Sequence, residues 1–202
     1  QRYPRQSAEL QPLRYEAAPV AIEDWLTGLR SSEEGELALL YPRPSTLCEK
    51  KRIRWHQLVR PWVSHLVAHA CERSLTSYIV GQDAVIALPP LSQAHARAAL
   101  GGLLEAWGAG LCEPLPVACK TAFAWLDALP EGEEKALAAA CDAYDGGRIG
   151  GERAQCPYLS RAYPDAAALL ADGRFHHWAE RLYRPLFVSA QLFEQTVAGD
   201  TE

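Results

Sequence analysis

The strongest chemical signal in the sequence is a cluster of basic side chains between residues 43 and 60. Six basic residues stand against a single acid, Glu49, so the segment is strongly positive in a chain whose net charge is −5. Clustered Lys and Arg neutralise phosphates, and an aromatic ring among them can stack on an unpaired base. The segment therefore predicts DNA contact through Arg43, Lys50, Lys51, Arg52, Arg54, Trp55 and Arg60. A solvated basic loop, or a docking site for an acidic protein, fits the same pattern.

Two other patterns come close to catalytic motifs, and each lacks a required residue. The glycine cluster at 146–153 has the spacing of a phosphate loop, but Glu152 and Arg153 stand where Lys and Ser or Thr are needed. His65 and His69 are one helical turn apart, yet the position after His65 is a leucine rather than the glutamate of a zinc protease. We expect a flexible loop in the first case, and surface or hydrogen-bonded core histidines in the second. The sequence predicts neither a metal site nor a cofactor.

Length and composition point to one globular domain, residues 1–202, in which 49% of the residues are hydrophobic. No run of 18 uncharged apolar residues occurs and no signal peptide opens the chain, so we expect a soluble, cytoplasmic protein without membrane contact. The six cysteines form no C-x-x-C pair, which favours small, buried, reduced side chains. The chain contains no methionine and begins abruptly, so we expect a C-terminal fragment of a longer protein.

The elements that must position these residues follow from hydrophobic periodicity. The pattern predicts strands at 9–17 and 36–41, a short helix at 19–30, and a helix at 55–71 whose apolar stripe leaves His65 on another face. It predicts a hairpin of 76–80 and 83–88 around Gly81 and Gln82. Helices are expected at 92–112, 119–129, 133–144, 163–171 and 175–197. The fold class is therefore mixed α+β, with a small early sheet and a helical C-terminal half.

Motifs along most of residues 43–193 resemble a known family. The chain contains Gly110-Leu111, Pro114-Leu115-Pro116 and the helix start Lys120-Thr121-Ala122-Phe123-Ala124-Trp125, and a Trp-x-x-His-Leu helix (Trp62, His65, Leu66) lies upstream. A closing LYRPLF run stands at 182–187. Together these resemble the C-terminal nuclease-like domain of the gamma chain of exodeoxyribonuclease V, RecC. Residues 1–29 are not placed by the resemblance.

The resemblance implies a degenerate nuclease domain of the PD-(D/E)XK, restriction-endonuclease-like type. Active members hold Mg²⁺ with two carboxylates and use a lysine beside the attacking water. When residues 38–44 are set against the family's catalytic strand, Leu40 stands at the acid and Pro42 at the lysine, so no hydrolysis is expected. The retained surface would then serve assembly with the alpha chain (RecD) and beta chain (RecB). It would also guide or separate duplex, forked and single-stranded DNA during double-strand break repair by homologous recombination.

Two alternatives stay open at this point. In the first, the domain is purely a protein-interaction module in which aromatic helices around Trp125, Trp178 and Phe187 dock the alpha chain without DNA contact. In the second, it is an active Mg²⁺-dependent nuclease that uses Glu36 and another carboxylate. Salt-sensitive DNA binding, capture of the alpha chain, and Mg²⁺-dependent degradation of DNA distinguish the three hypotheses.

Overall fold

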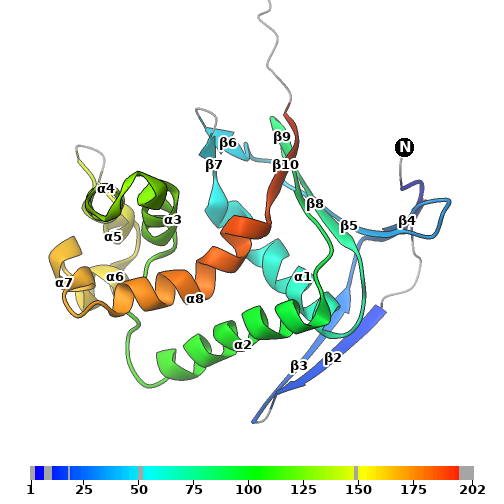
Figure 1. The fold of residues 1–202 in the computed structure, drawn as a ribbon, viewed down its shortest axis with the longest axis horizontal. Coiled ribbons are helices and arrows are strands. Elements are labelled where there is room, and N and C mark those ends of the chain that lie inside the picture. Colours follow the sequence, from blue (N-terminus) through cyan, green and yellow to red (C-terminus); the bar gives the residue numbers. More distant parts are fainter. Residues whose placement is uncertain (1–2, 7–10, 18, 50–51, 148–149, 196–202) are drawn as a thin grey trace, which may run out of the picture. The chain divides into compact units, whose positions relative to one another are not determined.

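Strands gather in the first half of the chain and helices in the second, which confirms the predicted α+β class (Figure 1). The computed structural model describes residues 3–6, 11–17, 19–49, 52–147 and 150–195. The chain divides into two compact units. The first consists of Gln1–Gly101 with Ser189–Glu202, and the second of Gly102–Val188. The first unit contains the strands, and the second is helical.

A six-stranded sheet forms the centre of the first unit. Its strands, in sheet order, are β1 (Arg5–Gln6), β4 (Leu29–Ser31), β5 (Leu37–Pro42), β8 (Thr76–Val80), β9 (Ala84–Leu88) and β10 (Gln191–Gln195). Strands β5 and β8 are parallel, and the other neighbours are antiparallel. The strand predicted at 36–41 and the hairpin around Gly81 are both confirmed.

Helix α1 (Val59–Ala70) connects the two parallel strands and follows a 3-10 turn, η1 (Trp55–Gln57). Leu58, Trp62 and Leu66 are buried as the apolar stripe requires, and Pro61 stands in the first turn, where its missing N–H has no helical partner to lose. The helix predicted at 55–71 is thus confirmed. Placing His65 off the stripe was wrong, because this side chain is fully buried.

The helix predicted at 19–30 was also wrong, because that segment forms β3 (Val20–Leu26) and then β4. Strand β3 pairs antiparallel with β2 (Gln11–Ala17), which confirms the strand expected there. The β-branched Val20 and Ile22 are half-buried and alternate with the exposed Ala21 and Glu23. This period of two, combined with pairing to β2, outweighs the approximate helical spacing of the apolar residues.

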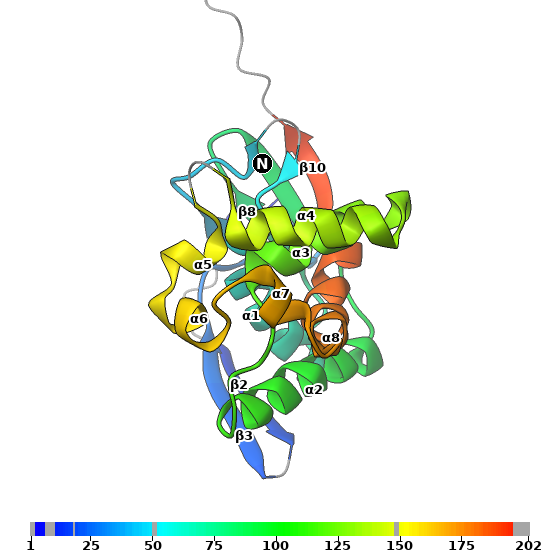
Figure 2. The same cartoon turned by 90° about the vertical axis from the view of Figure 1, so that its left-hand side faces the viewer.

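The second unit is built from helices, and it begins within α2 (Gln93–Gly110). The others are α3 (Cys119–Ala128), the 3-10 turn η2 (Leu129–Glu131), α4 (Glu133–Asp145), α5 (Glu152–Gln155), α6 (Pro157–Ala162), α7 (Ala166–Leu170) and α8 (Arg174–Ser189). Helices α3 and α4 lie side by side in both ribbon views (Figures 1 and 2). Predicted helices at 92–112, 119–129 and 133–144 are confirmed, whereas the one at 163–171 is shorter than expected.

The helix predicted at 175–197 was wrong beyond residue 189, where the chain turns into β10. Strand β10 pairs with β9 through the register Gln191↔Ala87 and Leu192↔Ile86. Because the pairing joins segments about one hundred residues apart, nothing in the local sequence distinguishes this strand from an extra helical turn.

Helix α3 begins without a capping side chain of its own, since Ala118 occupies the N-cap. The carboxylate of Glu152 supplies the cap from α5. It accepts hydrogen bonds from the Lys120 N–H at 3.0 Å, the Thr121 N–H at 2.8 Å and the Thr121 hydroxyl at 2.9 Å. A Cβ on Gly151 would lie 2.1 Å from the Tyr144 carbonyl oxygen, so glycine is required for this approach. A helix N-terminus that could attract an anion is therefore already occupied by the chain's own carboxylate.

Two further properties concern the cysteines and the helix lengths. All six cysteines are free thiols, but Cys112 is exposed and the other five are half-buried, so the expectation of buried cysteines was wrong. Among the described residues, no helix combines the length and the apolar character needed to cross a membrane.

Candidate nucleic-acid interface

The predicted DNA-contact residues that the structure describes lie between the end of β5 and the first turn of α1. Between these elements, β6 (Cys48–Glu49) and β7 (Arg52–Ile53) form a two-stranded ribbon. Arg52 and Arg60 are exposed, whereas Arg43, Arg54 and Trp55 are half-buried. Lys50 and Lys51 lie outside the described residues.

The loop that follows β5 is fastened to the turn between β8 and β9. The Arg43 N–H donates to the Val80 carbonyl at 2.8 Å, and the Gln82 side-chain amide donates to the Pro44 carbonyl at 2.9 Å. The Asp83 carboxylate accepts from the N–H groups of Leu47 at 2.7 Å and Cys48 at 2.9 Å. The hairpin turn, which the sequence predicted without any link to the basic segment, thus holds the loop after β5 in place.

Side-chain packing reinforces this attachment. Leu47 is fully buried beneath the turn, and a Cβ on Gly81 would lie 2.5 Å from its Cγ. Only glycine allows so close an approach of turn and loop.

Arg54 acts mainly within the loop itself. Its N–H donates to the Leu47 carbonyl at 2.7 Å, and its guanidinium donates to the Thr46 hydroxyl at 3.0 Å. Partial desolvation raises the pKa of Asp83, but the N–H groups of Leu47 and Cys48 together with the Arg54 charge leave that pKa below its ordinary value. Asp83 is therefore a carboxylate at neutral pH, and Arg54 helps to keep it one.

Arg43 and Arg60 converge near Tyr41. Burial and the charge of Asp24 raise the pKa of Tyr41, while the Ser64 side chain and the charges of Arg43 and Arg60 act in the opposite direction. The first turn of α1 contains no acid, so the partial positive charge of the helix N-terminus adds to that of Arg60. The Nε of Arg43 is buried and has no hydrogen-bond partner among the described residues. The end of β5 and the start of α1 together form a positively charged corner, in which Arg43 and Arg60 outnumber Asp24.

Exposed charge on the ribbon comes from Arg52, which lies opposite Glu49 in the β6–β7 register. Opposite charges at directly paired positions attract, so Glu49 offsets part of the Arg52 charge. Among the described basic residues of this segment, Arg52 and Arg60 are the exposed ones.

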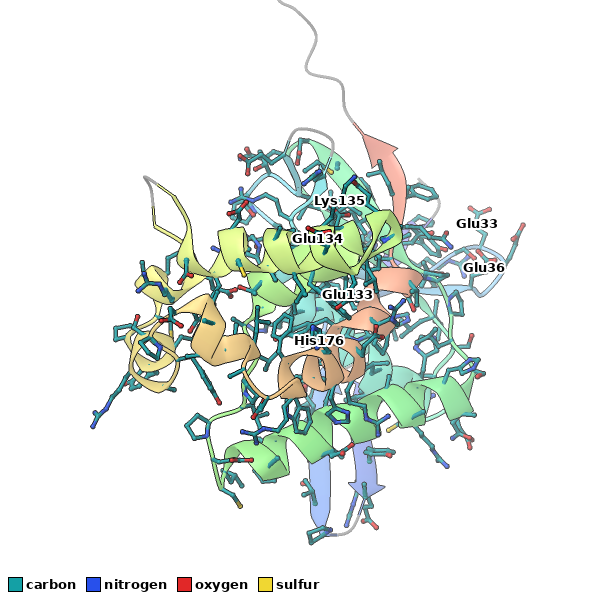
Figure 3. All side chains as sticks on the ribbon, turned by 60° about the vertical axis from the view of Figure 1, so that its left-hand side comes forward. Glu33, Glu36, Glu133, Glu134, Lys135 and His176 are labelled. Carbon is teal, nitrogen blue, oxygen red and sulfur yellow. The ribbon has the colours of Figure 1, made fainter. Side chains whose placement is uncertain are left out.

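The strand aligned with the nuclease motif is β5, in which Leu40 pairs with Tyr78 and Pro42 with Val80. Neither side chain can ligate Mg²⁺ or stabilise a hydroxide. Glu36, the acid of the nuclease alternative, lies on the outside of the turn just before β5, near Glu33 (Figure 3). Among the described residues, no three His, Cys, Asp or Glu side chains are close enough to share a metal ion.

The two helical histidines are core residues, one of the two roles that the sequence suggested. His65 Nδ1 is 2.9 Å from the Ser77 hydroxyl and Nε2 is 3.1 Å from the Pro89 carbonyl, while His69 Nδ1 is 2.8 Å from the His65 carbonyl. Burial, and then the neighbouring His69, lowers the pKa of His65 to about 3. Both ring nitrogens of His65 are occupied by hydrogen bonds, so this residue stabilises the contact of α1 with β8.

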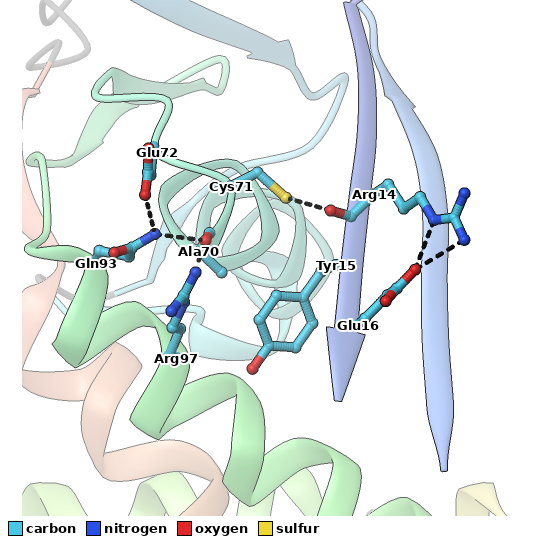
Figure 4. A pocket seen from close by; sticks show the side chains of 8 residues that line it. All are labelled: Arg14, Tyr15, Glu16, Ala70, Cys71, Glu72, Gln93 and Arg97. Atoms are coloured by element: carbon cyan, nitrogen blue, oxygen red, sulfur yellow. Dashed lines mark hydrogen bonds and ion pairs between the residues drawn. The ribbon is translucent and has the colours of Figure 1, made fainter. Parts of the chain in front are cut away.

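A hollow that sequence reasoning missed lies beside the C-terminus of α1 (Figure 4). It has a volume of about 500 Å³ and takes residues from β2, α1 and α2. Gln93 donates to the Ala70 carbonyl at 3.2 Å and to Glu72 at 2.9 Å, and the Cys71 thiol donates to the Arg14 carbonyl. Because these groups already bond to one another, the hollow offers few polar atoms to a ligand. No sequence motif indicated this hollow.

Comparison with known proteins decides the family. A family model described as the RecC C-terminal domain matches residues 1–130. The chain belongs to this family. The match includes the whole basic segment, the helix α1 and the β8–β9 hairpin, and it also includes residues 1–29, which the motifs alone did not place. It ends at residue 130, so the LYRPLF run at 182–187 lies outside it. Among curated proteins, the comparison finds no match.

Membership ties the chain to RecC, a subunit of the RecBCD complex, exodeoxyribonuclease V. That complex contains further subunits and acts on DNA.

Proposed function

We propose that this domain is a noncatalytic part of the gamma subunit of exodeoxyribonuclease V that guides DNA and contributes to subunit assembly. The observation that carries the DNA part is the positively charged corner of Arg43 and Arg60 with the neighbouring ribbon, which Asp83 fastens at the N–H groups of Leu47 and Cys48. A fastened loop presents its cations without first losing conformational entropy, so its phosphate contacts are preorganised. In the complete protein, we expect this corner to contact the forked and single-stranded DNA at the duplex junction.

The absence of hydrolysis in this proposal rests on β5. A nuclease of the PD-(D/E)XK type needs an acid and a lysine on this strand, and the chain has Leu40 and Pro42 at the aligned positions. We therefore propose that the domain has a degenerate nuclease fold without hydrolytic activity. We also propose that it acts in homologous recombination. Purified protein should leave labelled linear DNA intact in the presence of Mg²⁺, and degradation that Glu36→Ala abolishes would establish the nuclease alternative instead.

The assembly part is supported by apolar side chains on the surface of the second unit. Trp107, in the last turn of α2, is 55% exposed, and Leu111, directly after that helix, is 69% exposed. Two of the rings that were expected to dock a partner are not on the surface, because Trp125 and Trp178 are buried in the core of the unit. The proposed partners are the alpha chain (RecD) and the beta chain (RecB), with Trp107 and Leu111 as contact residues.

The DNA proposal is tested by charge reversal at exposed positions. Arg52→Glu and Arg60→Glu should together weaken binding of the full chain to a forked oligonucleotide and flatten its dependence on salt. Each lost phosphate contact should lower the slope of log K against log salt by about 0.7 to 0.9. Arg161→Glu, an equally exposed position on α6 with the same change in charge, is the control.

Arg54 is unsuitable for this experiment because its replacement would disturb the loop. Fluorescence anisotropy at several salt concentrations measures the binding. If the double variant binds as well as the Arg161→Glu control, the basic corner does not contact DNA.

A further inference from the structure

A second cavity lies wholly within the helical unit and takes its lining from α3, the start of α4 and α8. Its volume is about 600 Å³. The residues that line it are Trp125, Glu133, His176, His177, Glu180 and Arg181. Figure 3 shows Glu133 at the start of α4 close to His176 on α8.

Two ring nitrogens at this cavity are buried and have no hydrogen-bond partner among the described residues, Trp125 Nε1 and His176 Nε2. Trp125 as a whole is only 3% exposed, and its ring is 5.2 Å from that of His176. An indole N–H can only donate, so this buried group calls for an acceptor. Buried polar atoms in native proteins are normally paired, and one that is not points to a missing partner.

The charges around the cavity differ in how far they are neutralised. Glu180 is bonded by the Arg184 guanidinium, and Arg181 donates to Glu105 at 3.1 Å. Glu133 has only the imidazole of His176, 3.5 Å away, within the described part of the chain. The available charge at the rim is therefore a carboxylate.

These two requirements define the ligand. It must present an acceptor to the Trp125 N–H and a cation to Glu133, which a peptide does with a backbone carbonyl and a lysine or arginine side chain. A phosphate backbone would meet the carboxylate of Glu133 and be repelled. We propose that this cavity binds an arginine- or lysine-bearing peptide segment of a partner protein. The inference deepens the assembly part of the proposed function and is independent of the basic corner that faces DNA.

The experiment follows the indole N–H resonances of the ¹⁵N-labelled full chain while a blocked tripeptide, acetyl-Gly-Arg-Gly-amide, is added. The Trp125 signal, assigned by its absence in Trp125→Phe, should shift with peptide. Glu133→Gln should weaken peptide binding by roughly threefold, the range expected for a partly exposed ion pair. Glu134→Gln, a neighbouring first-turn carboxylate outside the lining, should leave binding unchanged.

Three results would overturn the proposal: no shift of the Trp125 signal, an equal shift with acetyl-Gly-Glu-Gly-amide, or equal binding by Glu133→Gln and Glu134→Gln. If Trp125→Phe does not fold, comparing peptide binding by Glu133→Gln and Glu134→Gln still tests the proposal, because both of these variants change exposed side chains. The DNA affinity of Glu133→Gln separates this proposal from the previous one. It should equal that of the unmodified chain, so either proposal can fail without the other.

Discussion

Glu152→Ala should destabilise the protein markedly, although the replaced carboxylate is only half-buried. The substitution removes the acceptor for two N–H groups and one hydroxyl at the start of α3, at distances of 2.8 to 3.0 Å. Thr121 is fully buried, so its N–H and hydroxyl would lose their partner where water cannot easily replace it. An N-cap contributes about 1 kcal/mol. Leaving a buried donor unpaired costs about 1 to 3 kcal/mol, so we expect a loss of roughly 3 kcal/mol.

Thermal unfolding followed by circular dichroism tests this expectation. For a chain of this size a loss of 1 kcal/mol lowers Tm by about 2 to 4 °C, which predicts a decrease of roughly 6 to 12 °C. Glu152→Gln keeps one carbonyl oxygen as an acceptor and should lose about half as much. Glu134→Ala changes an exposed first-turn carboxylate and serves as the control. If Glu152→Ala melts within 1 °C of that control, the carboxylate does not cap α3 in solution.

Two further predictions concern titration and the loop attachment. His65 has a folded-state pKa of about 3, below its ordinary 6.5, so the unfolded state binds a proton that the native state does not. The contribution of His65 to the free energy of unfolding is therefore fully present above about pH 6.5. It falls by about 1.4 kcal/mol per pH unit as the pH decreases from 6.5 toward 3. Urea unfolding of His65→Gln should show a shallower pH dependence; equal slopes would mean that His65 is protonated in the native protein. Asp83→Ala removes the acceptor of the Leu47 and Cys48 amides, and hydrogen exchange at both should accelerate by at least tenfold at pH 7. Unchanged protection there would show that Asp83 is not what holds the loop.

The elements that the sequence predicts correctly are those whose signal is local. The hydrophobic periodicity that predicts α1 and the β8–β9 hairpin lies within each element's own sequence, and the hairpin also contains its turn residues. Strands β3 and β10, which were predicted as helix, depend on partners instead. Val20 and Ile22 lie among residues whose spacing also suits a helix, and only pairing with β2 decides between the two.

The candidate interface was predictable for a similar reason, since its basic residues are contiguous from 43 to 60. What holds them was not predictable. Asp83 lies 36 positions after Leu47, and no motif links a turn carboxylate to a distant loop amide. Glu152 is a comparable case, because in the sequence it only breaks the pattern of a phosphate loop, whereas in the structure its carboxylate caps α3.

The structure separates the basic residues into supporting and contacting roles, and this separation sets a condition on the DNA proposal. Arg54 bonds within its own loop and stabilises the charge of Asp83, whereas Arg52 and Arg60 are exposed and bear little on packing. Reversal of Arg54 should lower both stability and affinity. Reversal of Arg52 or Arg60 should lower affinity at constant stability, because an exposed ion pair contributes less than about 1 kcal/mol to folding. A protein in which all three variants lost stability and affinity in proportion would bind DNA only through its folded shape, and the exposed cations would then have no separate role.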